Sequence, residues 1–360
     1  MDFSFTEEQG MLRDGLGRYL EKSYDFDARQ KVMRSDEPWS REAWAQYAEF
    51  GMLMLPFAEE AGGLGGSISD CVAVAELLGK QLTLEPYSHA VMLAGAALAA
   101  SDNDAAGDSL EKLMGGEALV AFAYEEGVGT ASPCLIGMTA TDGKLTGEKR
   151  LVIAGAEADA LVVAARQGEG GPLALYLVEQ GAAGLEARSY TTIDGLSAAN
   201  ISFDGVAATL LLNNAEEAVD AILARAITVQ CAEAVGAMGA LLAITGEYAA
   251  TRKQFGVAIG TFQAVAHRLA DMKIAYTKAR ATTLYTTALV EAGAATPRDI
   301  AIMKGQVGKL GRALGEAAIQ THGGVGMTDE LSVSHYHKRL LALDAQLGSH
   351  DYHLRMVGRG

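Results

Sequence analysis

Two long, alanine-rich segments with helical spacing flank a single break, and this break limits the possible folds more than any other feature. It reads TRKQFGVAIGTFQ and spans residues 251–263. Its glycine and the renewed helical pattern predict a turn between two long helices, with Arg252 at the end of the first. A helix C-terminus favours a cation, so Arg252 and Lys253 have two interpretations: C-terminal capping, or contact with a bound anion.

A glycine-rich turn occurs further along the chain, where residues 318–327 read AIQTHGGVGM. Helical patterning ends in Gly323, Gly324 and Gly326, which leaves backbone N–H groups that a phosphate could approach closely. The alternative is a helix that simply ends in glycine, as many helices do. Alone the turn is weak evidence for a site, but its combination with the RKQFG turn and Gln263 is much stronger.

Together the two segments resemble the acyl-CoA dehydrogenase family, and the resemblance covers nearly the whole chain. RKQFG…FQ resembles the family's R-x-x-FG…FQ segment, and QTHGGVGM resembles its Q-x-x-GG-x-G turn. In that family both segments reach across a subunit interface to hold the diphosphate and adenine half of an FAD whose flavin lies in the neighbouring subunit. The resemblance therefore implies FAD as cofactor and an acyl-CoA as substrate. The matching positions are Arg252, Phe255, Gln263, Gln320, Gly323, Gly324 and Gly326.

Secondary-structure patterns divide the chain into three segments. Helical spacing predicts an all-helical N-terminal domain at 1–117, in which Thr6 caps the first helix. Short apolar runs bounded by Gly and Asp predict a small β domain at 118–210, and long helical patterns predict a C-terminal four-helix bundle at 211–360. The fold class is therefore mainly α with a central β domain, the order of the acyl-CoA dehydrogenase fold. Helices are expected at 41–50, 69–79, 88–100, 105–114, 213–252 and 297–322, and a further helix is expected to begin at about 261. Strands are expected at 118–124, 160–166, 173–179 and 199–205, and a hairpin at 141–145.

Composition narrows the range of partners and compartments. The 360 residues carry a formal net charge of −16, which argues against nonspecific binding to nucleic acid or to an anionic membrane. Cys71, Cys134 and Cys231 are far apart and form no CxxC pair, so we expect free thiols in a reducing cytoplasm. The acidic N-terminus is unlike a secretory signal. Charges interrupt the alanine-rich runs, so we expect no segment long and apolar enough to span a membrane.

Both positions at which the family carries its catalytic base lack a carboxylate here. The family's reaction is an α,β-dehydrogenation, a step of β-oxidation, in which a carboxylate removes the α-proton while a hydride leaves the β-carbon for the flavin. Most members carry a Glu at a fixed spacing after the GG turn, where this chain has Leu347 followed by Gly348. Others carry it before the R-x-x-FG turn, where this chain has Ala226. Neither side chain can exchange a proton.

The segments that would face the flavin are altered as well. The family's TEPGAGSD loop corresponds to YEEGVGTASP at 124–133, which lacks the Gly-Ser-Asp ending. Its WIT segment corresponds to residues 151–153, Leu-Val-Ile, without the aromatic or the hydroxyl. The chain thus keeps what it would donate to a neighbour's FAD and lacks most of what it would need to hold its own.

This imbalance favours a non-catalytic small subunit beside a homologous catalytic large subunit, in a heterodimer or an α2β2 heterotetramer. YDFDARQ at 24–30 and LEPY at 84–87 also resemble the small subunits of heteromeric members such as pimeloyl-CoA dehydrogenase. Two alternatives stay open. One is an autonomous homo-oligomeric dehydrogenase with a relocated base, for which Asp344, His350 and Asp351 flank the vacant position. The other is a binding module that kept the fold and dropped the cofactor.

Four histidines near the C-terminus raise the question of a metal site. In an extended chain, however, HxH places two imidazoles on opposite faces, and no cysteine lies near. We therefore predict that the SHYHKR segment at 334–339 is a polar loop and that no metal is bound. The histidines are His335, His337, His350 and His353.

Overall fold

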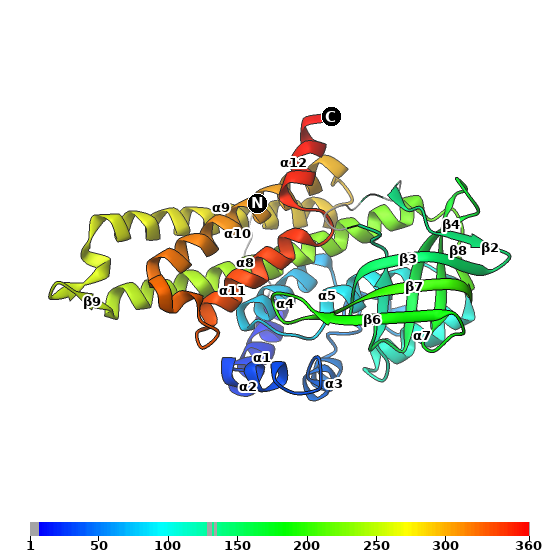
Figure 1. Ribbon diagram of the computed structural model, residues 1–360, viewed down its shortest axis with the longest axis horizontal. Helices are drawn as coiled ribbons and strands as arrows, with labels where there is room; N and C mark the ends of the chain where they lie inside the picture. The colour runs from blue at the N-terminus through cyan, green and yellow to red at the C-terminus, as the bar shows by residue number, and fades with distance from the viewer. Residues whose placement is uncertain (1–6, 128–131, 133–134, 360) are drawn as a thin grey trace. The chain divides into compact units, whose positions relative to one another are not determined.

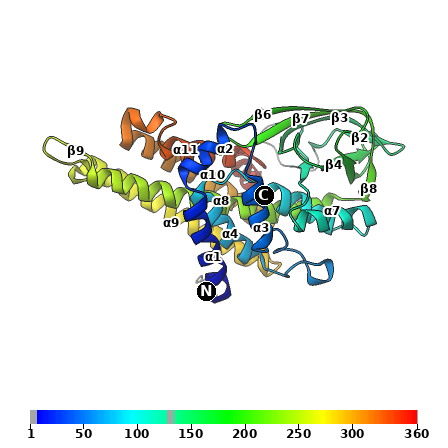
Figure 2. The same ribbon diagram turned by 90° about the horizontal axis from the view of Figure 1, so that it is seen from below.

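The computed structural model describes residues 7–127, 132 and 135–359, so Thr6 and its expected cap lie outside the described residues. Contacts group the chain into two compact units. Unit 1 comprises residues 1–30, 72–83 and 228–360, and unit 2 comprises residues 31–71 and 84–227. Figures 1 and 2 show helices early and late in the chain and a sheet in its middle, which confirms the predicted fold class. The division at 1–117, 118–210 and 211–360 stays a prediction.

Unit 1 is built on long helices. The second part of α8 (Glu216–Thr251) is followed by a two-stranded hairpin, β9 (Lys253–Gln254) and β10 (Val257–Ala258), and then by α9 (Gln263–Glu291) and α10 (Pro297–His322). In Figure 1 the hairpin labelled β9 lies at the far end of α8 and α9, where the chain reverses. The turn predicted between two long helices is therefore present.

The start of α10 shows how the sequence sets a helix boundary. Thr296 accepts a hydrogen bond from the backbone N–H of Asp299 at 3.3 Å, and the Asp299 carboxylate accepts one from the Thr296 N–H at 2.9 Å. Pro297 takes the first helical position, where its missing N–H costs nothing. The predicted helix 297–322 is confirmed at both ends.

Shorter helices complete unit 1, namely α1 (Glu7–Ser23), most of α2 (Phe26–Met33), the second part of α4 (Ile68–Gln81), α11 (Ser332–Ala345) and α12 (His350–Arg359). The prediction of a polar loop at 334–339 is wrong, because this segment lies within α11 and His335 is buried there. The short polar segment indicated a loop because the residues that bury it, described below, lie far away in the sequence.

Unit 2 contains an eight-stranded sheet. Its strand order is β6-β7-β3-β2-β4-β5-β8, and β1 pairs in parallel with β4. The hairpin predicted at 141–145 is present, with Asp142 and Gly143 both at positive φ in a two-residue turn. The strands are β1 (Val120–Ala123), β2 (Thr139–Thr141), β3 (Lys144–Ile153), β4 (Ala160–Gln167), β5 (Leu173–Glu179), β6 (Leu185–Thr191), β7 (Ser197–Ala207) and β8 (Thr209–Leu212).

The four predicted strands are all present, whereas β6 and β8 were not predicted. β6 is exposed along most of its length, so it lacks the apolar run that marked the others. The core of the sheet is formed by alternating small and branched side chains from several strands, including Leu161, Val163, Ile201 and Phe203.

The helices of unit 2 are α3 (Arg41–Glu49), the start of α4, α5 (Tyr87–His89), α6 (Ala96–Ala99), α7 (Asp104–Met114) and the first part of α8. The single helix predicted at 88–100 contains a π-helical stretch at Ala90–Gly95 between α5 and α6. Ser40 and Asn103 cap α3 and α7 through side-chain oxygens.

The expectation that no segment is long and apolar enough to span a membrane is wrong for one helix, α8. By length and composition alone, α8 is long and apolar enough to cross a membrane. Within its most apolar stretch, however, 61% of residues are buried inside the protein. A core helix meets the same criteria, so this is weak evidence for a membrane span.

Candidate functional site

The hairpin between α8 and α9 holds an aromatic side chain out in solvent. Phe255 and Gly256 form its two-residue turn with φ values of 53° and 83°. Such turns require positive φ at both positions and ordinarily use Asn, Asp or Gly. Phe255 is 93% exposed, so neither its conformation nor its position is explained by packing within this chain. An unfavourable conformation of a bulky apolar residue points to a role outside the chain.

Arg252 lies at the base of this hairpin, directly after the last residue of α8. Its N–H donates to Tyr248 O at 2.8 Å and its carbonyl accepts from Ile259 N at 2.8 Å, which fixes its backbone. Its side chain is exposed and forms no ion pair with any part of the chain that the structure describes. Gln263, the first residue of α9, is also exposed. Arg252 is therefore a fixed and available cation.

The three glycines after α10 have three different reasons to be glycine. Gly323 has φ 67° and ψ −149°, a region that essentially only glycine occupies. A Cβ on Gly326 would lie 2.8 Å from His322 Cβ and 3.3 Å from Ile319 O, so the turn itself excludes it. A Cβ on Gly324 would meet no atom within 4 Å. Gly324 is exposed, so packing within the chain does not require glycine at this position.

An aromatic pair connects the two segments. Tyr248, one turn before Arg252, stacks on His322, which directly precedes Gly323. The ring centroids are 4.3 Å apart with planes inclined by 24°. The structure thus brings together the two motifs that the sequence suggested to act jointly. Gln320 is exposed on the last turn of α10.

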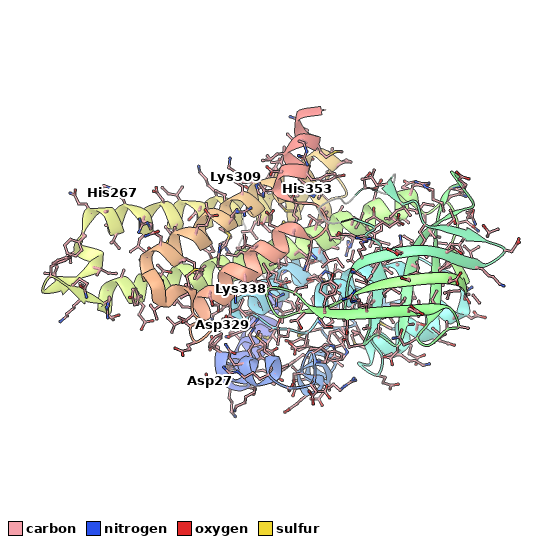
Figure 3. The ribbon with its side chains drawn as sticks, in the orientation of Figure 1. Asp27, His267, Lys309, Asp329, Lys338 and His353 are labelled. Carbon is pink, nitrogen blue, oxygen red and sulfur yellow. The ribbon has the colours of Figure 1, made fainter. Side chains whose placement is uncertain are left out.

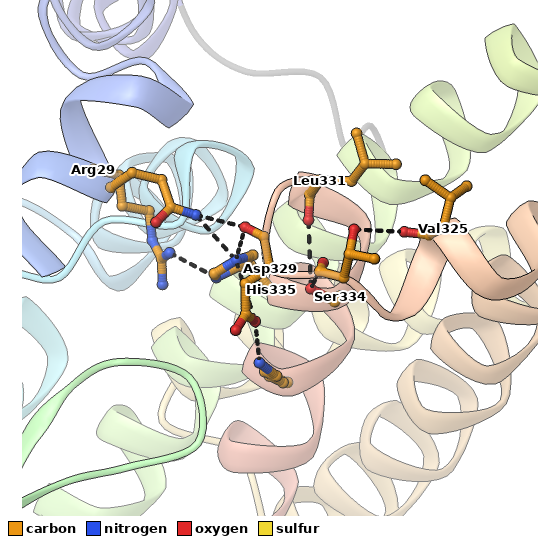
Figure 4. Close-up of polar contacts among 9 residues, drawn as sticks. Arg29, Val325, Asp329, Leu331, Ser334 and His335 are labelled. Atoms are coloured by element: carbon orange, nitrogen blue, oxygen red, sulfur yellow. Dashed lines mark hydrogen bonds and ion pairs between the residues drawn. The ribbon is translucent and has the colours of Figure 1, made fainter. Parts of the chain in front are cut away.

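A buried cluster anchors the chain just after the glycine turn (Figure 4). Arg29 of α2 donates from Nη1 to His335 Nδ1 at 3.0 Å, and His335 Nε2 lies 3.1 Å from Asp329 O. An arginine can only donate, so Nδ1 accepts and Nε2 carries the proton. Gln30 donates to the same Asp329 carbonyl at 2.9 Å. The segment that follows the turn is therefore held from the side of α2.

Further contacts keep this cluster in one arrangement. Ser334 Oγ donates to Thr328 O at 2.8 Å, and Lys338 Nζ pairs with the Asp329 carboxylate at 2.7 Å. Asp329 and Lys338 are labelled in Figure 3. Burial is the main cause that lowers the pKa of His335, so its neutral form is favoured. Residues far apart in sequence thus fix the end of the turn.

Exposed apolar side chains surround the two turns. They lie on the hairpin, at the start of α9 and in the glycine turn, and Met327 is 67% exposed. Phe255 and Phe262 meet edge to face with ring centroids 6.1 Å apart. Exposed apolar groups that gather near a polar feature are typical of a protein interface. The set is Phe255, Val257, Phe262, Val325 and Met327.

The first vacant base position is closed rather than open. Leu347 is only 3% exposed and has φ 52°, an unfavourable value for leucine. Its carbonyl accepts a hydrogen bond from His353 Nε2 at 2.9 Å. Gly348 has φ 92°, and a Cβ there would lie 2.7 Å from His353 Nε2. Internal packing therefore explains this glycine.

Asp344, the nearest substitute base, is committed to a structural role. It is 6% exposed and accepts from the His350 N–H at 2.8 Å, and its Oδ2 accepts a hydrogen bond from His350 Nδ1 at 2.6 Å. A Cβ on Gly308 would lie 2.1 Å from Asp344 Oδ1, so that glycine makes room for the carboxylate. Asp344 thereby caps the start of α12. Asp351 is exposed, with its carboxylate 3.5 Å from His350 Nε2.

The second base position, Ala226, is completely buried in α8 and offers no group for proton transfer. Nearby in the chain, Cys231 is also buried, and burial raises the pKa of its thiol to about 12. A thiol with so high a pKa is a poor base or nucleophile. Neither residue replaces the missing carboxylate.

The loop expected to face the flavin is partly tied to the sheet. Lys149, fully buried, donates to Tyr124 O at 3.1 Å and pairs with Glu126 at 2.7 Å. Glu126 also accepts from the N–H groups of Gly137 at 2.7 Å and Met138 at 3.1 Å. Burial lowers the pKa of Lys149 to about 8, against the opposing effect of Glu126. Residues 128–131 and 133 of this loop lie outside the described residues.

The WIT-like segment at 151–153 ends strand β3 after a β-bulge. Leu151 has φ 53°, whereas Val152 and Ile153 are buried in the sheet. These side chains offer neither an aromatic face nor a hydroxyl to a ring system.

Sequence reasoning missed two groups of buried charges. One is the Lys149–Glu126 pair, which the strand alternation of β3 could have indicated, because Lys149 falls on the inward face with Leu145. The other is Arg29 with His335, whose partners lie 306 positions apart in the chain. Within the residues searched, no three His, Cys, Asp or Glu side chains group in a way that would hold a metal ion.

Comparisons with known proteins agree with this architecture. Residues 6–117 match the family description "Acyl-CoA dehydrogenase, N-terminal domain", and residues 217–360 match "Acyl-CoA dehydrogenase, C-terminal domain". Acyl-CoA dehydrogenase FadE27 of Mycobacterium tuberculosis (strain ATCC 25618 / H37Rv) is 28% identical, over 100% of this chain and 98% of its own length.

Solved structures give the same result. The ChsE4-ChsE5 complex from Mycobacterium tuberculosis contains a chain that is 27% identical, with a TM-score of 0.89 over 100% of this chain and 98% of that chain. The FAD complex of PigA is 25% identical, with a TM-score of 0.88 over 100% and 98%. The predicted fold, with an N-terminal helical domain, a central β domain and a C-terminal helical domain, is confirmed. The chain belongs to the acyl-CoA dehydrogenase family.

Proposed function

We propose that this chain is the non-catalytic small subunit of a heteromeric, FAD-dependent acyl-CoA dehydrogenase in the cytoplasm. It completes the cofactor site of a homologous catalytic subunit, which supplies the base and the flavin-facing residues. The complex would carry out the α,β-dehydrogenation of an acyl-CoA thioester.

One observation carries this proposal. Arg252, Phe255 and residues 323–325 of the glycine turn are exposed, and their backbone is fixed, whereas the positions of both bases are buried and apolar. Arg252 has no carboxylate partner among the described residues, and Gly324 leaves room for close approach, so both features favour an anionic ligand. Leu347 and Ala226 cannot remove a proton from a substrate.

The residues present fit the diphosphate and adenosine half of FAD. Arg252 would pair with phosphate oxygens, and the open backbone at Gly324 would allow close approach of the diphosphate or the ribose. Gln263 and Gln320 would supply amide groups to its polar atoms. When bound, FAD supplies the hydride acceptor of the reaction.

The partner is inferred from what surrounds these residues. Exposed Phe255, Val257 and Met327 would be buried by a subunit that covers the two turns. FadE27 supports the acyl-CoA dehydrogenase activity, and the ChsE4-ChsE5 complex supports an assembly of two different chains. A heterodimer or an α2β2 heterotetramer satisfies the arrangement.

The proposal is tested by the flavin content of the complex formed with its catalytic subunit. Arg252→Ala should weaken FAD binding about 10- to 100-fold, because a charge-assisted contact to phosphate is lost. Lys253→Ala is the matched control, since Lys253 is the adjacent exposed cation, and it should change FAD binding less than about threefold. Equal FAD binding by the Arg252→Ala and wild-type complexes would refute the proposal.

An autonomous dehydrogenase with Asp344 as base is the second candidate, and the structure disfavours it. The carboxylate is buried and already bonded to two nitrogen atoms of His350. If the chain alone oxidised an acyl-CoA and Asp344→Asn abolished that activity, this candidate would replace our proposal. A binding module without cofactor is the third, and the absence of flavin from every assembly of the chain would favour it.

A further inference from the structure

The ends of the two helices that carry the candidate cofactor-binding residues are joined through a single aromatic pair. Tyr248 on the last turn of α8 and His322 at the end of α10 have stacked rings, 4.3 Å between centroids. Tyr248 Oη also lies 3.5 Å from His322 O, at the limit of a hydrogen bond. Both residues belong to unit 1, and His322 is buried.

The His322 ring and the Tyr248 backbone are each hydrogen-bonded within their own helical segment. His322 Nδ1 donates to Ala318 O at 3.0 Å, and since a carbonyl only accepts, the proton sits on Nδ1. The Tyr248 carbonyl accepts the N–H of Arg252 at 2.8 Å and the Thr251 hydroxyl at 3.4 Å. Tyr248 therefore links directly to the backbone of Arg252, one helical turn away.

On the other side, the stack links directly to the glycine turn. His322 precedes Gly323, and Gly326 folds back so closely that a Cβ there would lie 2.8 Å from His322 Cβ. His322 is therefore packed directly against the turn. The stack connects it to Tyr248, whose carbonyl accepts the N–H of Arg252.

We propose that Tyr248 and His322 are positioning residues, which hold Arg252 and the glycine turn at the separation that a dinucleotide diphosphate requires. The inference rests on the proposed function. It assigns to neither residue a contact with the cofactor. A diphosphate is bound well only if its cationic and N–H partners are fixed together, because each ångström of misplacement weakens charge-assisted hydrogen bonds.

The experiment uses the complex with the catalytic subunit, stripped of flavin and titrated with FAD. Tyr248→Leu removes the ring and should raise the dissociation constant of FAD about three- to tenfold. Tyr248→Phe keeps the ring and should stay within about twofold of wild type. His322→Leu and His322→Phe repeat the comparison from α10, so the test survives if one variant fails to assemble.

A double-mutant cycle separates positioning from general packing. In the Arg252→Ala background there is no guanidinium left to position, so Tyr248→Leu should weaken FAD binding by less than about twofold. Equal affinities of the Leu and Phe variants at both positions would overturn the inference. So would an undiminished effect of Tyr248→Leu in the Arg252→Ala background. If Arg252→Ala itself left FAD affinity unchanged, the proposed function would fail first.

Discussion

Two regions at the C-terminal end of the chain carry unusual backbone and glycine residues, but for opposite reasons. In the hairpin and glycine turn, Phe255 is strained and exposed, and Gly324 faces open space. Around the vacant base position, Leu347 is equally strained but buried, and Gly348 is required by His353. Packing within the chain accounts for the second region but not for the first.

This difference between exposed and buried strain indicates where to look for function in a chain that has no carboxylate at either base position. The strain at Leu347 is compensated by packing and a hydrogen bond within the chain. No such packing covers Phe255, which is 93% exposed. The proposed function explains this contrast, because it gives the first region a role in binding groups outside the chain and the second a structural role.

The largest expected effect is a loss of folding stability at acidic pH, caused by His353 beside the closed base position at Leu347. Burial is the main cause that lowers the pKa of His353 from 6.5 to about 4. Unfolding restores the higher pKa, so as the pH falls below 6.5 the unfolded chain binds the proton first. Stability is therefore full above pH 6.5 and decreases by about 3 kcal/mol between pH 6.5 and 4.

Urea unfolding at a series of pH values measures this dependence. His353→Gln keeps an N–H donor for Leu347 O but cannot titrate, so it should flatten that part of the profile. His267→Gln, at an exposed histidine of α9, is the control and should leave the profile as in wild type. An unchanged slope in His353→Gln would show that His353 does not limit the acid stability of this region.

Next in size is the loss of the Asp344 cap. Asp344→Ala should lower the free energy of unfolding by about 2 kcal/mol, because two partly buried donors of His350 lose their acceptor. Turnover by the complex should persist, since the carboxylate takes no part in proton transfer. Asp351→Ala changes an exposed carboxylate and should cost less than about 0.5 kcal/mol. Loss of turnover in a folded Asp344→Ala complex would make this residue the base after all.

The smallest expected change in stability is that of Gly324→Ala, and it separates two glycines of one turn. Gly324→Ala should change the free energy of unfolding by less than about 0.5 kcal/mol, yet weaken FAD binding by the complex about tenfold. Gly326→Ala should destabilise the chain by about 1–3 kcal/mol, because its Cβ would overlap His322. Thermal unfolding and FAD titration of both variants make the comparison. A Gly324→Ala chain that loses stability but keeps its FAD affinity would reverse our assignment.

Much of the fold could be predicted because local signals are strong. Pro297 and Thr296 mark the start of α10, the glycines mark its end, and Asp142-Gly143 marks a hairpin. The π-helical stretch in 88–100 and the exposed strand β6 could not be predicted, because neither has a distinct hydrophobic period. The helix at 334–339 was missed because its polar residues are buried by distant partners such as Arg29.

For the candidate site, the motifs predicted which residues take part but not which residues contact one another. The occurrence of both motifs in one sequence predicted that Arg252 and the glycine turn act together. The Tyr248–His322 stack that joins their helices became visible only in the structure. Likewise the absence of a base at Leu347 followed from the sequence. The commitment of Asp344 to His350 became visible only when the packing of α11 and α12 was known.

The most direct test of the central claim is the flavin content and subunit composition of the natively isolated assembly. We predict two kinds of homologous subunit with one FAD for each pair, and no stoichiometric FAD on this chain when it is purified alone. An assembly of this chain only, with one FAD per subunit and the ability to oxidise an acyl-CoA, would contradict the account.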